Sequence, residues 1–103
     1  MVTVTYFSGD HLVTFLRSLD AVTDVMPQVI IADNGSDDGA PERAEQEYDT
    51  VTLVRTGGNI GYGGAVNRGV AETDTEFVVV ANPDVEWTPK AIDLLLAEGF
   101  LTA

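Results

Sequence analysis

The sequence contains no cysteine and very few basic residues. Its 103 residues include 5 Lys plus Arg against 17 Asp plus Glu, which gives a formal net charge of −12. Without cysteine, disulfides and thiolate metal sites are excluded. A net charge of this sign repels nucleic-acid phosphates and anionic lipid headgroups, so we expect no nucleic-acid partner.

Long apolar runs and a leader-like N-terminus are missing as well. No apolar run approaches the roughly 20 residues that a membrane helix needs, and no basic stretch followed by an apolar run marks a signal peptide. We therefore expect a cytoplasmic protein. Hydrophobic residues make up 45% of the chain, which is enough for the core of one domain spanning residues 1–103.

Short runs rich in β-branched residues alternate with segments of helical spacing. The predicted strands are Val2–Phe7, Gln28–Asp33, Thr50–Arg55 and Glu76–Ala81. Four apolar residues at i, i+3, i+4 and i+7 predict a first helix: Leu12, Phe15, Leu16 and Leu19.

Capping signals mark the helix ends. Asp10 is the expected N-cap of the first helix, and Pro41 is expected in the first turn of a second. A third helix is expected over residues 64–71. A fourth would follow Thr88-Pro89 and end at Gly99.

This alternation predicts an α/β fold. We expect a Rossmann-like three-layer α/β/α arrangement with a mostly parallel sheet of about four strands. The run 77–81 is typical of a strand buried on both faces. Ligands bind outside the carboxyl ends of such strands. The segments 8–10, 34–39, 57–59 and 82–84 should therefore cluster at one edge of the sheet.

The segment Asp33–Gly39 follows the second predicted strand. A carboxylate at Asp33 could accept hydrogen bonds from the N–H groups of a uracil or thymine base, whereas the simpler interpretation is an acidic turn with a helix cap. The spacing also partly fits a calcium-binding loop, through Asn34, Ser36, Asp38, Gly39 and Glu45. Pro41 and the preceding strand argue against that loop, because a helix should enter it.

A glycine-rich run follows the third predicted strand. Residues 57–64 hold five glycines in eight positions, which lets the backbone approach a ligand closely. The helix that follows would point its positive end at the same crevice. The run matches neither the dinucleotide fingerprint nor a phosphate-binding Walker loop. A flexible loop with a close helix–sheet contact is the alternative.

Asn82-Pro83-Asp84 ends the last apolar strand. Asp84 would then lie at the carboxyl edge, where a divalent cation bound to a diphosphate needs only one or two protein carboxylates. A plain turn is the alternative, because Asn-Pro-Asp is good turn chemistry. His11, the single histidine, is expected to be a surface residue rather than a ligand. Tyr62 lies in the glycine-rich run and is expected to be a packing or loop residue that could line the pocket.

Together these segments resemble the family 2 inverting glycosyltransferases, which have the GT-A fold. The resemblance is carried by four blocks in the family's order: Val4–Phe7, Asp33–Gly39, the Asn59–Gly69 run and Asn82–Asp84. The Asn-Pro-Asp block and the Asn-x-Gly run look most like the rhamnosyltransferase branch. This chain would correspond to the N-terminal, nucleotide-sugar-binding half of the GT-A fold.

The resemblance implies a role for each matching position. Thr5 and Tyr6 would lie against the base and ribose, and Asp33 would hydrogen-bond the base. The stretch from Gly61 through Gly64 to Asn67 would border the nucleotide.

The metal motif of the family departs from its commonest form in this chain. Asp84 would bind Mn²⁺ or Mg²⁺ as the last acidic residue of the Asp-x-Asp motif. Asn82 replaces the first acidic residue and is expected beside the nucleotide, which leaves Asp84 as the main metal carboxylate.

The resemblance also implies what lies outside this chain. The general base of the family comes later in its catalytic domain, so no catalytic residue is expected before residue 103, and this chain would be an inactive truncated part. The donor would be a nucleotide-diphosphate sugar with a thymine or uracil base, dTDP-rhamnose in the rhamnosyltransferase branch. A cell-envelope glycan or polyprenyl-linked acceptor would bind the missing C-terminal part, at the inner face of the membrane, and the apolar edge left exposed would permit a homodimer.

Two other functions fit an α/β layout. A sugar-nucleotide nucleotidyltransferase would carry a basic glycine-rich segment after its first strand, but Ser8–His11 contains no Lys or Arg. A non-enzymatic flavodoxin-like module of the receiver type would need paired acids after the first strand and a lysine near its end. Lys90 is the single lysine and fits that place poorly.

Overall fold

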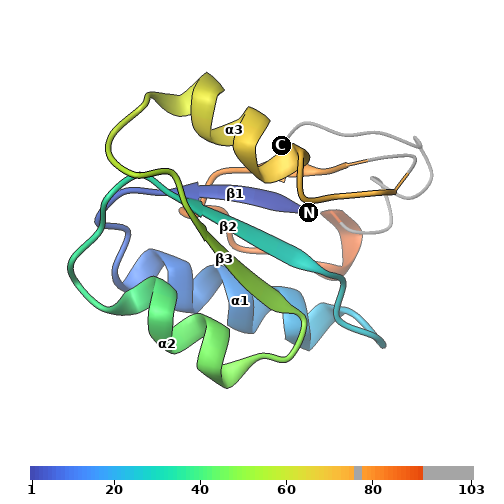
Figure 1. Ribbon diagram of the computed structural model, residues 1–103. Helices are drawn as coiled ribbons and strands as arrows, with labels where there is room; N and C mark the ends of the chain where they lie inside the picture. The colour runs from blue at the N-terminus through green and yellow to red at the C-terminus, as the bar shows by residue number, and fades with distance from the viewer. Residues whose placement is uncertain (76–77, 92–103) are drawn as a thin grey trace.

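The computed structural model describes residues 1–75 and 78–91. The elements, in chain order, are β1 (Val2–Thr5), α1 (Asp10–Val22), β2 (Val29–Asp33), α2 (Ala40–Glu47), β3 (Val51–Arg55), α3 (Tyr62–Val70) and β4 (Val80–Ala81). All strand pairs are parallel, in the order β3-β2-β1-β4. Figure 1 shows α1 and α2 on one face of the sheet and α3 on the other. The predicted α/β/α architecture is confirmed.

The strand order creates a topological switch point between β1 and β4. From β1 the chain moves through α1 and α2 toward one side of the sheet, and it then returns over the other face through α3 to reach β4. The loops that follow β1 and β4 therefore lie side by side at the carboxyl edge of the sheet, where both line one hollow. A crevice between such loops is the usual ligand position in open α/β sheets.

The core forms where α1 packs on the sheet. The predicted apolar stripe of α1 is buried along its whole length, as the helical spacing required. β2 is buried at every residue because it lies inside the sheet with helices on both faces. Trp87 adds an edge-to-face contact with Phe15, with ring centroids 5.9 Å apart. Each buried side chain of this size contributes about 1.5–3 kcal/mol.

Several predicted boundaries are wrong by one or two residues. β1 ends at Thr5 rather than Phe7, because Phe7 has a positive φ of 56° that breaks the extended strand. Asp10 is the first residue of α1 and not its cap, since Gly9 occupies the N-cap position without a side-chain hydrogen bond. α3 begins at Tyr62, before the predicted residue 64.

The last predicted strand is shorter than expected within the described residues. β4 covers Val80–Ala81, and Val78 to Val80 are only partly buried, so the strand buried on both faces is β2. Residues 76–77 lie outside the described residues. The predicted end of the fourth helix, at Gly99, lies outside them too. Among residues 1–75 and 78–91, no helix has the length and apolar character needed to cross a membrane.

α3 lies unusually close to β1. A Cβ at Gly69 would come within 2.5 Å of Val2 Cγ1, so a side chain there could not be accommodated without movement. Glycine therefore permits the close approach of the helix to the sheet. This packing fixes α3 over the sheet and thereby fixes where its N-terminus points.

Candidate functional site

Two adjoining hollows lie at the carboxyl edge of the sheet. The first, which we call the Asp84 hollow, has a volume of about 370 Å³ and is lined by Tyr6, Phe7, Ser8, His11, Asn82, Pro83 and Asp84. The second, the Asn34 hollow, has a volume of about 330 Å³ and is lined by Val4, Tyr6, Ser8, Asn34, Asn59, Tyr62, Asn82 and Pro83. Because four residues line both, the two hollows form one continuous crevice at the switch point.

The segments predicted to meet at one edge do so. The loops after β1, β2, β3 and β4 each contribute a residue to this crevice, namely Ser8, Asn34, Asn59 and Asn82. A smaller hollow of about 190 Å³ lies between α1 and α2, lined by residues of those helices and by Tyr48 beside α2 rather than by strand ends. The position at the strand ends favours the carboxyl-edge crevice as the functional site.

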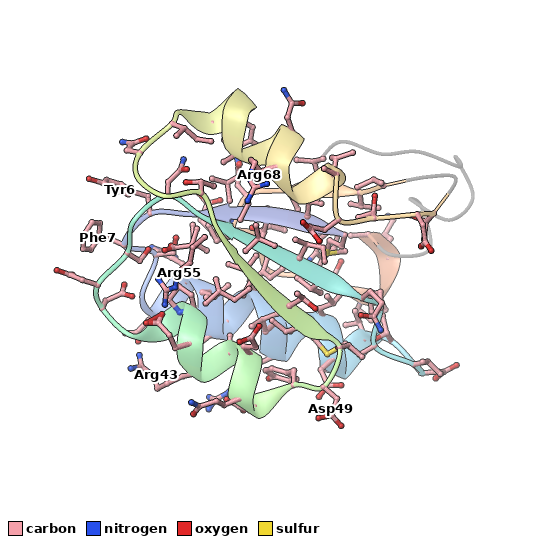
Figure 2. All side chains as sticks on the ribbon, viewed as in Figure 1. Tyr6, Phe7, Arg43, Asp49, Arg55 and Arg68 are labelled. Carbon is pink, nitrogen blue, oxygen red and sulfur yellow. The ribbon has the colours of Figure 1, made fainter. Side chains whose placement is uncertain are left out.

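The predicted site residues divide into exposed and buried ones. Tyr6, Asn82 and Asp84 are exposed and line the crevice. Thr5 and Asp33 are almost completely buried, at 0% and 1% exposure, and line neither hollow. Tyr6 and Phe7 project at the end of the molecule opposite Asp49 in Figure 2.

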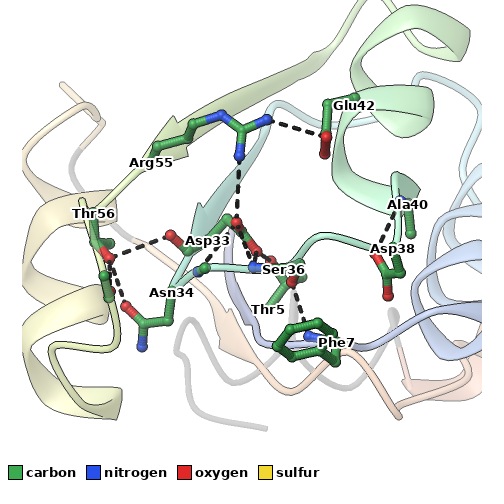
Figure 3. A network of polar contacts seen from close by, with 12 residues as sticks. Thr5, Phe7, Asp33, Asn34, Ser36, Asp38, Ala40, Glu42, Arg55 and Thr56 are labelled. Carbon is green, nitrogen blue, oxygen red and sulfur yellow. Dashed lines mark hydrogen bonds and ion pairs between the residues drawn. The ribbon is translucent and has the colours of Figure 1, made fainter.

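The carboxylate of Asp33 points into the protein, where the chain's own donors surround it (Figure 3). The Thr5 hydroxyl donates to Oδ1 at 2.7 Å, and the Ser36 N–H donates to Oδ2 at 3.0 Å. The Gly35 N–H adds a longer bond of 3.3 Å to Oδ2. Arg55 completes the surroundings, with Nη1 3.7 Å from Oδ2 and Nη2 3.2 Å from Oε2 of Glu42. Asp33 thus links the ends of β1, β2 and β3.

Asn34 is the residue of this loop that reaches the crevice. Its Nδ2 donates to the carbonyl of Gly61 at 3.1 Å, and its Oδ1 accepts from the Thr56 hydroxyl at 2.7 Å. These bonds connect the β2 end to the loop that precedes α3. The amide is therefore held at a fixed place on the wall of the Asn34 hollow.

The glycine-rich run delivers the N-terminus of α3 to the same edge. Gly61 precedes α3 with a φ of 83°, and its N–H donates to Oδ1 of Asn59 at 3.1 Å. Gly64 lies in the first turn of the helix, partly buried against Ile60. Asn67 is exposed further along α3 and lines neither hollow.

Sequence reasoning missed several residues that the crevice brings together. Asn34, Asn59 and Ser8 line it and were not assigned a role, although each follows a predicted strand, which was the available signal. Tyr62 was not missed, because its place in the glycine-rich run indicated a pocket residue, and it lines the Asn34 hollow. His11 is exposed, as predicted, yet it lines the Asp84 hollow, because the first turn of α1 begins directly after the β1 loop.

Among the residues that the structure describes, the crevice offers one carboxylate and no basic side chain from Lys or Arg. Asp84 is exposed, and its carboxylate has no hydrogen-bond or ion-pair partner among residues 1–75 and 78–91. No group of three His, Cys, Asp or Glu residues forms a metal site in the described parts of the chain. Mg²⁺ and Mn²⁺ accept such a sparse protein contribution when phosphates and water supply the other ligands. The residues present fit a cation that binds together with a diphosphate.

The calcium-loop alternative does not fit the structure. Ser36 accepts a bond from the backbone N–H of Phe7, and Oε2 of Glu45 accepts from the N–H of Leu53. α2 also begins at Ala40, inside the segment that would have to wrap the ion. These side chains therefore do not converge on one point.

Comparisons with known proteins agree with this architecture. The sequence profile of glycosyl transferase family 2 matches residues 1–98. The chain is 47% identical, over 107 aligned residues, to N-acetylglucosaminyl-diphospho-decaprenol L-rhamnosyltransferase from two strains of Mycobacterium tuberculosis. The alignment covers 93% of this chain and 35% of those proteins, so the chain spans about a third of the length of the curated relatives it matches.

Solved structures show the same fold. S. aureus TarS 1-349 superposes with a TM-score of 0.78 at 22% identity, covering 93% of this chain and 30% of that one. The same protein in complex with UDP-GlcNAc gives a TM-score of 0.77, covering 93% and 29%. The family match favours the glycosyltransferase prediction over the nucleotidyltransferase and the flavodoxin-like module. From its profile match and its fold, the chain belongs to glycosyl transferase family 2.

Proposed function

We propose that this chain binds the nucleoside diphosphate of an activated sugar in the carboxyl-edge crevice, as the donor-binding part, residues 1–103, of a glycosyltransferase. The observation that carries the proposal is the continuity of the two hollows at the switch point. One end presents aromatic rings and amides, which suit a base and ribose. The other end presents the carboxylate of Asp84, which has no partner among residues 1–75 and 78–91 and suits a cation and a diphosphate.

The base and ribose would lie in the Asn34 hollow. Tyr6 and Tyr62 are each about half exposed there, and their rings offer flat apolar surface to a base. The amides of Asn34 and Asn82 provide donors and acceptors for its polar edge. Asp33 is directed away from this space, so we assign it a supporting role behind Asn34 rather than a direct bond to the base. Gly61 and Gly64 do not line this hollow themselves, and Gly61 supports it by accepting the hydrogen bond from Nδ2 of Asn34.

The diphosphate would lie in the Asp84 hollow together with Mn²⁺ or Mg²⁺. Neither hollow is lined by Lys or Arg, and the chain carries a net charge of −12. A doubly charged diphosphate therefore needs another source of positive charge. A divalent cation at Asp84 supplies it and stabilises the charge on the departing nucleoside diphosphate as the glycosidic bond breaks.

The related rhamnosyltransferases suggest the reaction of the whole protein. Their printed name describes rhamnosyl transfer to N-acetylglucosaminyl-diphospho-decaprenol, and 47% identity supports a similar lipid-linked acceptor and a rhamnosyl donor such as dTDP-rhamnose. Inverting transfer needs a general base to deprotonate the acceptor hydroxyl. We place that base outside residues 1–103. A cytoplasmic location at the inner membrane face and a homodimer stay predictions.

Nucleotide titration tests the proposal. We would titrate dTDP, UDP and GDP by calorimetry, with and without Mn²⁺, into the wild type, Asp84→Asn and Asp49→Asn. Asp49 is a matched control, because it is also an exposed aspartate but lies at the opposite end of the molecule (Figure 2). We expect metal-dependent binding of dTDP or UDP that weakens at least tenfold, about 1.4 kcal/mol, in Asp84→Asn only. Equal binding by all three proteins would exclude a metal site at Asp84. No nucleotide binding by the wild type would contradict the proposed donor site.

A further inference from the structure

Phe7 has a backbone conformation that its residue type rarely adopts. Its φ of 56° lies in the left-handed region, and among residues 1–75 and 78–91 it is the one non-glycine residue with a positive φ. Such strain persists only where the surrounding structure enforces it, and it is common at functional sites. The Phe7 ring is also about half exposed and lines the Asp84 hollow. An exposed, strained aromatic residue at the crevice needs an explanation other than core packing.

The β2–α2 loop holds the Phe7 backbone in this conformation. The N–H of Phe7 donates to Oγ of Ser36 at 2.8 Å (Figure 3). The N–H of Gly9 donates to Oδ2 of Asp38 at 3.1 Å, so the same loop holds the segment at a second point. The Ser36 side chain is buried, which protects its bond to Phe7 from competition by water. A residue 29 positions away in the sequence therefore fixes the turn after β1.

Asp33 in turn fixes Ser36. Its two carboxylate oxygens accept the Ser36 N–H at 3.0 and 3.3 Å, and the Thr5 hydroxyl holds the same carboxylate at 2.7 Å. Arg55 stands behind it, with Nη1 3.7 Å from Oδ2 (Figure 3). The contacts thus run from a buried carboxylate, through a buried serine, to the strained residue on the surface.

The conformation of Phe7 sets the direction of two rings. Tyr6 and Phe7 meet edge to face, with centroids 4.8 Å apart, and both line the Asp84 hollow. If Phe7 relaxed to a negative φ, the chain direction and both rings would shift. A ligand would then have to restore the wall when it binds, which weakens affinity.

We propose that Ser36, held by Asp33, is a positioning residue that locks Phe7 in its left-handed conformation and keeps the Tyr6–Phe7 ring pair in place as a wall for the nucleoside diphosphate. The ligand part of this inference rests on the proposed function. The backbone part stands on the hydrogen bonds alone. Neither Asp33 nor Ser36 needs to touch the ligand.

The test compares Ser36→Ala with a closely matched serine variant. Oγ of Ser18 also accepts a backbone N–H at 2.8 Å, from Trp87, and Ser18 is partly buried away from the crevice. Ser18→Ala therefore removes the same kind of bond without touching Phe7. Ser36→Thr keeps a hydroxyl and serves as the conservative rescue. Each protein is studied by NMR for the sign of φ at residue 7, through the intraresidue amide–α-proton NOE, and by calorimetry with UDP and dTDP in Mg²⁺.

We expect Ser36→Ala to lose the positive φ at residue 7 and to bind the preferred nucleotide at least tenfold more weakly. Ser18→Ala should lower the melting temperature about as much as Ser36→Ala does, but it should keep the positive φ at residue 7 and the nucleotide affinity. Ser36→Thr should restore the positive φ and the affinity. A positive φ retained in Ser36→Ala with unchanged affinity would overturn the proposal. So would an equal loss of affinity in Ser18→Ala, because that would show a general effect of stability.

Two further observations keep the test decisive. If the wild type binds no nucleotide, the proposed function fails, while the NMR comparison still decides whether Ser36 locks Phe7. If Ser36→Ala does not fold, hydrogen exchange of the wild-type Phe7 amide decides instead. Slow exchange, despite the exposed side chain, supports the bond to Ser36, and exchange as fast as in an open loop overturns it.

Discussion

The β2–α2 loop and the β4 loop form opposite sides of the crevice, and they are held very differently. In the β2–α2 loop, the side chains of Asp33, Asn34 and Ser36 are buried and hydrogen-bonded to neighbouring strands and loops. In the β4 loop, Asn82 and Asp84 are exposed, and one backbone bond, from the Val85 N–H to the Asn82 carbonyl, closes the turn. One side is organised before a ligand arrives, whereas the side chains of Asn82 and Asp84 make no hydrogen bond or ion pair among residues 1–75 and 78–91.

The difference assigns separate tasks to the two acidic residues at the strand ends. Asp33 accepts bonds from the protein itself and stabilises the arrangement of three strand ends. Asp84 has no such partner in the described parts of the chain and is available to a cation. The same residue type thus serves the fold on one side and the ligand on the other.

The largest expected effect is a difference in stability between the alanine variants of these two aspartates. Asp33→Ala leaves the buried Thr5 hydroxyl and the Ser36 N–H without their acceptor, so we expect a loss of about 3 kcal/mol in the free energy of unfolding. Asp84→Ala should change it by less than about 0.5 kcal/mol, as is usual for an exposed surface side chain. Urea unfolding followed by circular dichroism measures both. Similar losses of unfolding free energy in the two variants would contradict the proposed difference between the loops.

A second prediction concerns what ligand binding does to each loop. With nucleotide and Mn²⁺ at about 100 times Kd, the folded state gains about 2.7 kcal/mol. We expect amide exchange in residues 82–86 to slow markedly on binding, because that loop acquires its contacts from the ligand. Exchange in residues 33–38 should change little, since those bonds already exist. Hydrogen–deuterium exchange followed by mass spectrometry measures both segments. A larger change in residues 33–38 than in residues 82–86 would contradict the prediction.

Thr56→Val gives an intermediate effect within the organised side. The Thr56 hydroxyl lies 2.7 Å from Oδ1 of Asn34 and 2.6 Å from the Gly58 carbonyl. Removing it should cost about 1 kcal/mol of stability and loosen the Asn34 amide. Thr73→Val is a suitable control, because within the described residues the Thr73 hydroxyl bonds to the nearby Val70 carbonyl alone, at an exposed position. The NMR signals of the Asn34 side-chain amide report this loosening. If they are unchanged in Thr56→Val, the bond to the Gly61 carbonyl is enough to hold the Asn34 side chain.

The smallest expected effect lies outside both loops. Burial raises the pKa of Tyr48, and the nearby carboxylates of Glu47 and Asp20 raise it further. A raised pKa means that the folded state favours the neutral phenol. Its contribution is present below the ordinary value of 10.0 and is lost as pH rises above it. We expect Tyr48→Phe to reduce the decline in melting temperature above pH 10 slightly, and an identical decline in both proteins would refute this assignment.

The local patterns of the sequence predicted the fold well. The apolar stripe of α1 depends only on helical spacing, and the alternation of strands and helices fixed the parallel sheet through the handedness of its crossovers. The clustering of the four loops at one edge followed from the rule for carboxyl ends. Tyr62 was already marked as a residue that could line the pocket, and it does.

The details within each loop could not be read from local patterns. β2 is buried on both faces, so its sequence carries no alternation to show that Asp33 points inward while Asn34 reaches the crevice. The end of β1 depends on the bond from Phe7 to Ser36, which joins residues distant in the sequence. Similarly, Asp10 looked like a cap because nothing local indicates that Gly9 takes that position.

The measurement that tests the central claim most directly is a map of amide chemical shifts during titration with UDP or dTDP in Mg²⁺. We predict that the largest shifts fall on Tyr6, Asn34, Asn82 and Asp84, which surround the crevice from three strand ends. Residues of the α1–α2 hollow, such as Arg17 and Arg43, should not shift. Largest shifts in that hollow, with none at the carboxyl edge, would contradict the account.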